Sequence, residues 1–152
     1  MRAAVAAVLV SGVLLPVTLF ASLGGAVSTV EADRVRMKSA LVGIDQRGPY
    51  TVHSIQTPTG TTIREYYGSN GVVFAVAWQG PWQPDLRQLF GDYFDRYQTG
   101  VQRARRARTS RGRVAIDDGT LIVKIGGHQR AIAGVAYVPQ LLPAGVDPGV
   151  IK

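Results

Sequence analysis

The sequence predicts an α+β fold in which an antiparallel sheet of about five strands packs against one amphipathic helix, in the order βββ-α-ββ, preceded by an N-terminal helix. Three observations support this prediction: stretches rich in β-branched and aromatic residues, short turn sequences between them, and one long stretch with helical periodicity. The chain has 152 residues, of which 46% are hydrophobic, and a formal net charge of +7. This length and composition suit one compact domain.

Three stretches rich in Val, Ile, Thr, Tyr, Phe and Trp predict the first three strands: residues 50–56, 61–67 and 72–79. The connections at 57–60 and 68–71 contain Gly with Pro or Asn, which is typical of tight turns. Neighbouring strands should therefore pair antiparallel as a meander. Phe74, Val76 and Trp78 share one parity, so alternation predicts that they face the helix together.

The clearest periodicity in the chain predicts a helix over residues 85–100. From Leu86 onward, apolar side chains recur every three or four residues, while charged and amide side chains occupy the opposite face. Asp85 suits the first turn of this helix, and Gly100 is expected to end it.

A capping box at residues 28–31, with the sequence Ser-Thr-Val-Glu, predicts that the N-terminal helix begins there. Apolar residues continue near one face as far as Ile44, and Gly43 or the Gly48-Pro49 pair should end the helix.

Strand patterns resume at residues 113–116, where the signal is weaker, and more firmly at residues 121–125, and another strand is predicted over residues 129–138. The sequence Asp117-Asp118-Gly119 predicts the first turn between them, and Gly126-Gly127 predicts the second, as a hairpin. The final stretch, 141–152, is rich in Pro and Gly. It should be irregular chain that covers a sheet edge.

Residues 1–25 have the features of a secretory signal peptide. After Arg2 no charge occurs until Glu31, and residues 3–20 are nearly all apolar. Small residues between positions 21 and 26 place the cleavage site there, and 26–152 form the single domain. The chain is therefore expected to be exported, to the periplasm or the medium. An uncleaved membrane anchor is the alternative.

The absence of cysteine excludes disulfides, thiolate nucleophiles and zinc-thiolate sites. Only two histidines occur, His53 and His128, and no cluster of acids accompanies them. Two such distant residues do not form a set of metal ligands, so no metal or cofactor is expected.

Residues 101–113 lack apolar periodicity and are predicted to form a basic, solvated loop. This loop contains six arginines: Arg103, Arg105, Arg106, Arg108, Arg111 and Arg113. Guanidinium groups pair with phosphate and carboxylate, so the loop is predicted to contact anionic envelope components, either lipid headgroups or polysaccharide. No aromatic residue interrupts the loop and no groove-reading motif is present, which argues against sequence-specific binding of nucleic acid. A solvated loop without a partner is the alternative.

Three further residues are possible ligand contacts. His128 and Arg130 follow the Gly126-Gly127 pair, and Trp82 lies beyond the end of a strand, where an aromatic ring is expected to be exposed. The leading functional hypothesis is a non-catalytic, envelope-associated binding domain. One alternative is a small periplasmic hydrolase or transferase that uses His128. Another is a subunit of a larger assembly with an envelope protein.

Several short motifs together resemble a bacterial exported family, catalogued as domain of unknown function 2844. They are Leu23-Gly24-Gly25, Arg64-Glu65-Tyr66, Val73-Phe74-Ala75-Val76, Pro84-Asp85-Leu86-Arg87, Gly126-Gly127-His128 and Ala136-Tyr137-Val138-Pro139. The resemblance covers nearly the whole mature chain. It implies an exported single domain and assigns no catalytic residue. This sequence departs from the family pattern in the density of its arginine-rich stretch.

Overall fold

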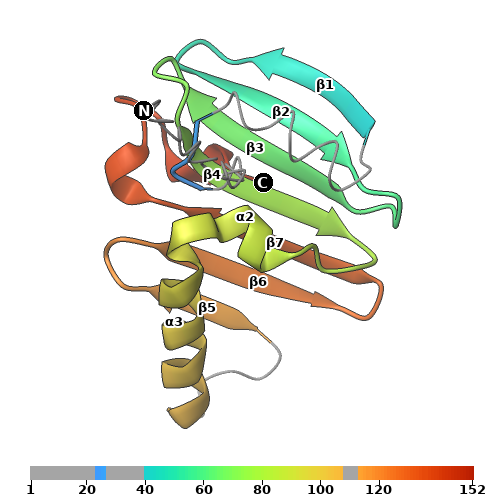
Figure 1. Cartoon of the computed structure of the whole chain (residues 1–152), viewed down its shortest axis with the longest axis vertical. Coiled ribbons are helices and arrows are strands. Elements are labelled where there is room, and N and C mark those ends of the chain that lie inside the picture. Colours follow the sequence, from blue (N-terminus) through green and yellow to red (C-terminus); the bar gives the residue numbers. More distant parts are fainter. Residues whose placement is uncertain (1–22, 27–39, 108–112) are drawn as a thin grey trace, which may run out of the picture.

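A computed structural model describes residues 23–26, 40–107 and 113–152. These residues form an α+β fold around one seven-stranded, fully antiparallel sheet with the order β1-β2-β3-β4-β7-β6-β5. Figure 1 shows β1 and β5 at opposite edges of the sheet, with the helices in front of its lower half. The strands are β1 (Ala40–Gln46), β2 (Tyr50–Gln56), β3 (Thr62–Gly68), β4 (Val73–Gly80), β5 (Val114–Asp117), β6 (Ile122–His128) and β7 (Ala131–Tyr137).

The sheet therefore has seven strands, whereas the sequence predicts about five. The predicted meander of β2, β3 and β4 is confirmed. Strand β1 lies where the end of the N-terminal helix is predicted, so that part of the prediction is wrong. Residues 46–49 turn the chain tightly, with Gly48 at a φ of 68° and the Arg47 N–H donating to the carbonyl of Tyr50, and this turn pairs β1 with β2. The remainder of the predicted helix, residues 28–39, lies outside the described residues.

The predicted orientation of Phe74 is also wrong. Strand β4 pairs Ala75 with Tyr66 and Val73 with Tyr67, so Phe74 is an extra residue in a β-bulge. The bulge shifts the alternation, and Phe74 packs on the face opposite to Val76 and Trp78.

The predicted amphipathic helix is confirmed, but it consists of three segments: α2 (Leu86–Phe90), the 3₁₀ turn η2 (Gly91–Tyr93) and α3 (Phe94–Arg106). Asp85 caps α2, because its Oδ1 accepts hydrogen bonds from the backbone N–H groups of Arg87 and Gln88 at 2.9 and 3.3 Å. Gly100 does not end the helix as predicted. It lies inside α3, which continues to Arg106. The first part of the predicted basic loop is therefore helical.

The last hairpin also differs from the prediction. Gly126 and Gly127 lie within β6, and the turn is formed by Gln129 and Arg130. Gly127 has a φ of 120°, and a Cβ there would lie 2.1 Å from the carbonyl oxygen of Ala131. Glycine is thus needed because at this φ a side chain would point into the paired strand β7, and not because the position belongs to the loop.

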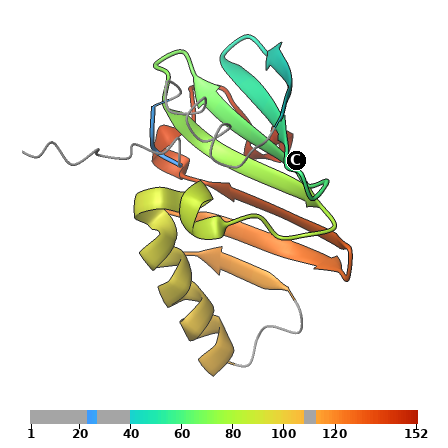
Figure 2. The ribbon, with the colours of Figure 1, turned by 45° about the vertical axis from the view of Figure 1, so that its right-hand side comes forward.

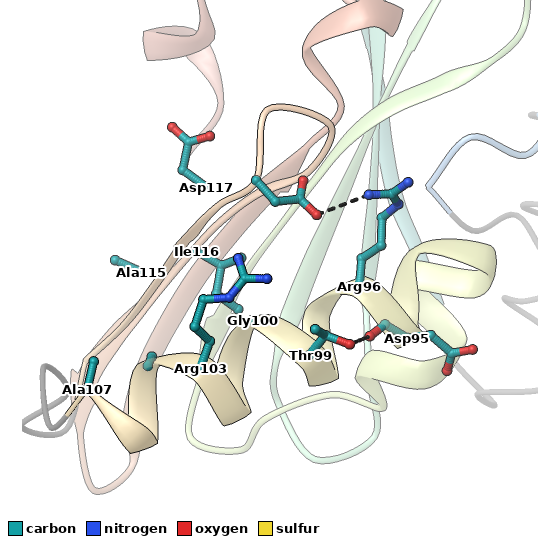
Figure 3. A pocket seen from close by; sticks show the side chains of 11 residues that line it. Asp95, Arg96, Thr99, Gly100, Arg103, Ala107, Ala115, Ile116 and Asp117 are labelled. Atoms are coloured by element: carbon teal, nitrogen blue, oxygen red, sulfur yellow. Dashed lines mark hydrogen bonds and ion pairs between the residues drawn. The ribbon is translucent and has the colours of Figure 1, made fainter.

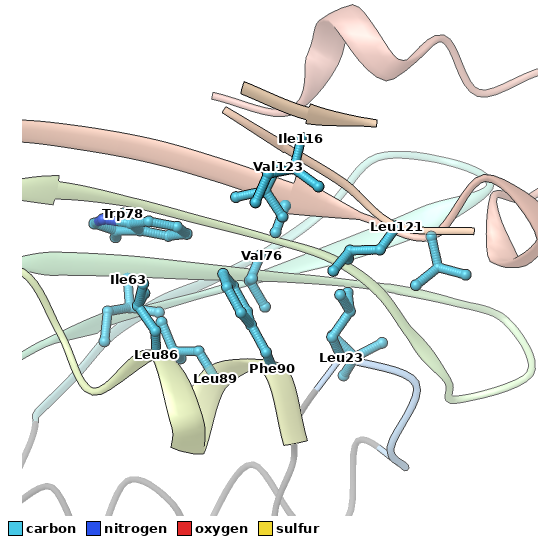
Figure 4. Close-up of a cluster of buried hydrophobic side chains, with 13 residues drawn as sticks. Leu23, Ile63, Val76, Trp78, Leu86, Leu89, Phe90, Ile116, Leu121 and Val123 are labelled. Carbon is cyan, nitrogen blue, oxygen red and sulfur yellow. The ribbon is translucent and has the colours of Figure 1, made fainter. Parts of the chain in front are cut away.

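Two apolar layers enclose the sheet. On one face α2 and α3 cover a cluster that includes Val76, Trp78 and Phe90 (Figure 4). On the other face the C-terminal segment, with the 3₁₀ turns η3 (Pro139–Leu141) and η4 (Pro148–Val150), packs its apolar side chains on Tyr66 and Phe74. This segment is irregular as predicted, but it covers a sheet face and not an edge.

Residues 23–26 belong to the folded domain. Leu23 is 1% exposed within the helix-side cluster, and its N–H donates to the carbonyl of Leu89 at 3.0 Å. The Gly24 N–H donates to Val73, and the Val73 N–H donates to Gly25. Within the described ranges, no helix is long and apolar enough to cross a membrane.

Replacing Gly134 with alanine tests whether the Trp78 ring requires the space that this glycine leaves open. A Cβ at Gly134 would lie 2.2 Å from Cζ2 of Trp78, a fully buried ring. We expect Gly134→Ala to lower the free energy of unfolding by about 1–3 kcal/mol, the usual cost of overpacking. Chemical denaturation measures this change. The matched control is Gly43→Ala, where an added Cβ meets nothing within 4 Å. An equal effect of the two substitutions would contradict the packing argument.

Candidate functional site: the groove between α3 and β5

Four of the six predicted anion-binding arginines lie in the described residues. Arg103, Arg105 and Arg106 occupy the last turns of α3, and Arg113 directly precedes β5. All four are exposed, and none forms an ion pair with any described residue. Arg108 and Arg111 lie outside the described residues. The four described arginines thus lie at the end of α3 and directly before the start of β5.

A groove of about 600 Å³ separates α3 from β5, which is a volume typical of small-molecule sites. Small residues line it, among them Gly100 and Ala104, and Figure 3 shows the groove from close by. Charged side chains stand along its margins: Asp95, Arg96, Arg103, Asp117 and Asp118.

The shape of this groove depends on Gly100. A Cβ there would lie 2.6 Å from Cγ2 of Ile116, a buried residue of β5. Because glycine has no side chain, α3 can lie directly against Ile116. Ala104 and Ala107, further along α3, also line the groove.

Opposite charges are fixed at one end of the groove. The Arg96 Nη1 donates to Oδ2 of Asp118 at 3.2 Å. The other carboxylate oxygen accepts from the N–H groups of Leu121 and Thr120, at 2.8 and 3.0 Å. The backbone hydrogen bond from Leu121 is the main cause that lowers the pKa of Asp118, with contributions from Thr120 and Arg96. Asp118 is thus held as a carboxylate.

Arg103 has no such partner. It lies seven residues after Arg96, two helical turns and about 10 Å along the axis. Figure 3 shows the side chains of Arg96 and Arg103 rising on the same side of α3, toward β5, whereas the carboxylates of Asp95 and Asp117 point away from the groove. Two guanidinium groups and the Asp118 carboxylate therefore border the groove, which suits a bound anion.

Sequence reasoning missed Arg96 and Asp118 as members of this site. The spacing of Arg96 and Arg103 by seven residues places them on one helix face, and that pattern is visible in the sequence. Their proximity to Asp118 is not visible in the sequence, because it depends on how α3 packs beside β5.

The three residues predicted as possible ligand contacts, His128, Arg130 and Trp82, do not line the α3–β5 groove. His128 lines a second hollow of about 330 Å³ together with Gln83 and Tyr97. Trp82, next to Gln83, is 59% exposed, in agreement with the prediction. Arg130 lies in the β6–β7 turn with a φ of 65° and does not line this hollow.

The surroundings of His128 offer no catalytic partner. Its Nδ1 lies 3.2 Å from the carbonyl oxygen of Gln129, and the described residues that line the hollow include no Ser, Asp or Glu. Burial raises the pKa of Tyr97, and the nearby Arg105 opposes this shift, so the phenol is not activated as a base. The geometry gives the hydrolase hypothesis no support.

His53 has a structural environment. Its Nε2 and the Tyr67 hydroxyl are 2.9 Å apart, and the two rings are nearly perpendicular. Partial burial lowers the pKa of His53, which favours the neutral imidazole. No group of three or more His, Asp or Glu side chains able to hold a metal ion occurs within residues 23–26, 40–107 and 113–152.

Comparison with known protein families gives one match, described as a protein of unknown function (DUF2844), over residues 19–151. The match covers nearly the whole chain and confirms the resemblance seen in the sequence motifs. No curated protein and no solved structure matches the chain.

Replacing Asp118 with asparagine tests the charged end of the groove. Because the folded state lowers the pKa of Asp118 below its ordinary value of 3.8, the carboxylate stabilises the fold at neutral pH, and this contribution is lost as the pH falls through the lowered pKa. We expect Asp118→Asn to lower the denaturation midpoint at pH 7, and the difference from wild type to close below pH 3.8. Asp92→Asn, an exposed acid with no bond to a described residue, is the control. A difference independent of pH would contradict this account.

Proposed function

The chain belongs to the DUF2844 family of proteins of unknown function, and we propose that this member is an exported, non-catalytic domain that binds an anionic component of the bacterial envelope at the α3–β5 groove. The observation that carries the proposal is the set of arginines around this groove, Arg103 foremost, with no carboxylate partner among the described residues.

The charge distribution supports an anionic ligand. Outside Arg2 and the six arginines of residues 103–113, the sequence has ten basic and ten acidic residues, so the net positive charge is concentrated near α3. Two acids near the groove already have partners and do not pair with Arg103. Asp118 accepts a hydrogen bond from Arg96, and Oδ1 of Asp117 accepts from the Gly119 N–H. A positive patch of this kind attracts anions.

The floor of the groove supports an amphiphile. Small or apolar residues line the groove beside the guanidinium groups, among them Gly100, Ala104 and Ile116. A lipid headgroup would place its phosphate between Arg96 and Arg103 and its glycerol carbons on this floor. An anionic polysaccharide uses the same guanidinium groups and leaves the apolar floor unused, so a lipid headgroup is favoured.

Export is supported by the N-terminal sequence. The apolar stretch of residues 3–20 has the features of a signal segment, and the family match begins only at residue 19. The burial of Leu23 restricts the cleavage site, because a cut after residue 24 or 26 would remove a core side chain. A cut after Ala21 retains it.

Binding to lipid vesicles tests the proposed function. We expect the protein to bind vesicles that contain phosphatidylglycerol, to release them as salt rises, and not to bind phosphatidylcholine vesicles. A triple variant, Arg103→Gln with Arg105→Gln and Arg106→Gln, should lower the affinity by about 100-fold, since each basic residue near a membrane surface contributes about 1 kcal/mol.

The matched control for that variant removes three exposed basic charges elsewhere: Arg47→Gln, Arg87→Gln and Lys124→Gln. It should bind vesicles nearly as well as the wild type. Equal losses in the two triple variants would show that net charge alone causes binding, and would reject the groove as the site.

The position of cleavage is a separate prediction. We expect the intact mass of the exported protein to show that Leu23 is retained. A chain that begins at residue 27 should be less stable than one that begins at residue 22 by about 2–5 kcal/mol, the range for loss of a buried leucine side chain. A mature chain that lacks Leu23 and melts at the same temperature would contradict the proposed cleavage.

A further inference from the structure

A third hollow, of about 430 Å³, lies on the sheet face opposite α2 and α3, between the β1–β2 hairpin and the C-terminal residues. We call it the tyrosine hollow. Its lining residues are Asp45, Arg47, Tyr50, Val52, Ser54, Arg64, Tyr66, Gln79, Val150 and Lys152. Sequence analysis did not identify it, because its residues come from four strands, a turn and the chain end.

Fixed hydrogen bonds hold one wall of the tyrosine hollow in place. The hydroxyl of Tyr66, a residue only 3% exposed, donates to the carbonyl oxygen of Lys152 at 2.9 Å. The same oxygen accepts from Nη1 of Arg64 at 3.1 Å, and the Lys152 N–H lies 3.2 Å from the Tyr66 hydroxyl. The Arg64 guanidinium is thereby oriented before any ligand arrives.

Other polar groups that line the hollow are not used within the protein. The Ser54 hydroxyl, the Tyr50 hydroxyl and the Gln79 amide form no hydrogen bond with any described residue. They come from adjacent strands, and together they offer several donors and acceptors over one surface.

The side chains that line the hollow carry a net positive charge. Three basic side chains line it, Arg47, Arg64 and Lys152, against one acid, Asp45, which already forms an ion pair with Arg47. The partly exposed Tyr50 ring lies 6.1 Å from the buried Tyr66 ring and is tilted by 39° to it, so Tyr50 is the aromatic ring that a ligand can reach. Such rings combine an apolar face with a polar hydroxyl.

We propose that the tyrosine hollow binds an acidic saccharide. The carboxylate of a uronic acid pairs with Arg64, the ring hydroxyls bond to Ser54, Gln79 and Tyr50, and the apolar face of the sugar ring packs on the partly exposed Tyr50 ring. A bare phosphate satisfies the arginines and leaves the hydroxyl and amide groups unused. This inference is independent of lipid binding at the α3–β5 groove, which lies against the other face of the sheet.

Titration calorimetry with trigalacturonate tests the proposal, and neutral galactotriose provides the matched ligand. We expect saturable binding of trigalacturonate and at least tenfold weaker binding of galactotriose. Arg64→Gln should weaken trigalacturonate binding by about 10- to 100-fold, the loss expected for a hydrogen bond to a charged group. Arg87→Gln, which removes the same charge from α2, should leave binding unchanged.

Ser54→Ala provides a second variant in case Arg64→Gln disturbs the C-terminal segment, and it should weaken binding by several-fold. Amide chemical shifts should change in β2 and β3 when trigalacturonate is added, and not in α3. Lack of saturable binding, equal binding of the two sugars, equally tight binding of inorganic phosphate, or shifts confined to α3 and β5 would each overturn the proposal.

Discussion

Burial of β4 on both faces is the constraint on which the rest of the structure depends. Residues 73–78 are each at most 1% exposed, so the central strand requires an apolar layer on either side. The α2–α3 segment supplies one layer and the C-terminal segment supplies the other (Figure 2). The Leu23 side chain completes the helix-side layer. Each of these chain segments is therefore held in place through the same strand.

Two glycines make room for large core side chains, one within the sheet and one on the helix. Trp78 lies against Gly134 of the neighbouring strand β7, and Ile116 of β5 lies against Gly100 of α3. These contacts let large apolar side chains fill the space between the layers. They also leave α3 standing beside the edge strand β5, with small side chains between them. The α3–β5 groove is thus a consequence of core packing.

The two candidate sites differ in how their charges are arranged. At the α3–β5 groove, Asp118 neutralises Arg96, while the arginines that follow on α3 have no described partner. In the tyrosine hollow, Arg64 is oriented by the carbonyl of Lys152 and is surrounded by unused hydroxyl and amide groups. The first arrangement suits a charged headgroup on an apolar support. The second suits a ligand with both charge and many hydroxyls.

The sequence by itself determined the β2–β4 meander, the amphipathic α2–α3 segment, the exposure of Trp82 and the concentration of arginine near residues 103–113. These features follow from local periodicity, turn composition and charge, which the chain carries within a few residues. Only the tertiary structure decided that residues 40–46 form β1, that Phe74 is bulged, and that Gly100 lies within α3. It also decided which arginines face a groove. Each of these outcomes depends on contact with another strand or helix, and local patterns do not encode the position or register of such a partner.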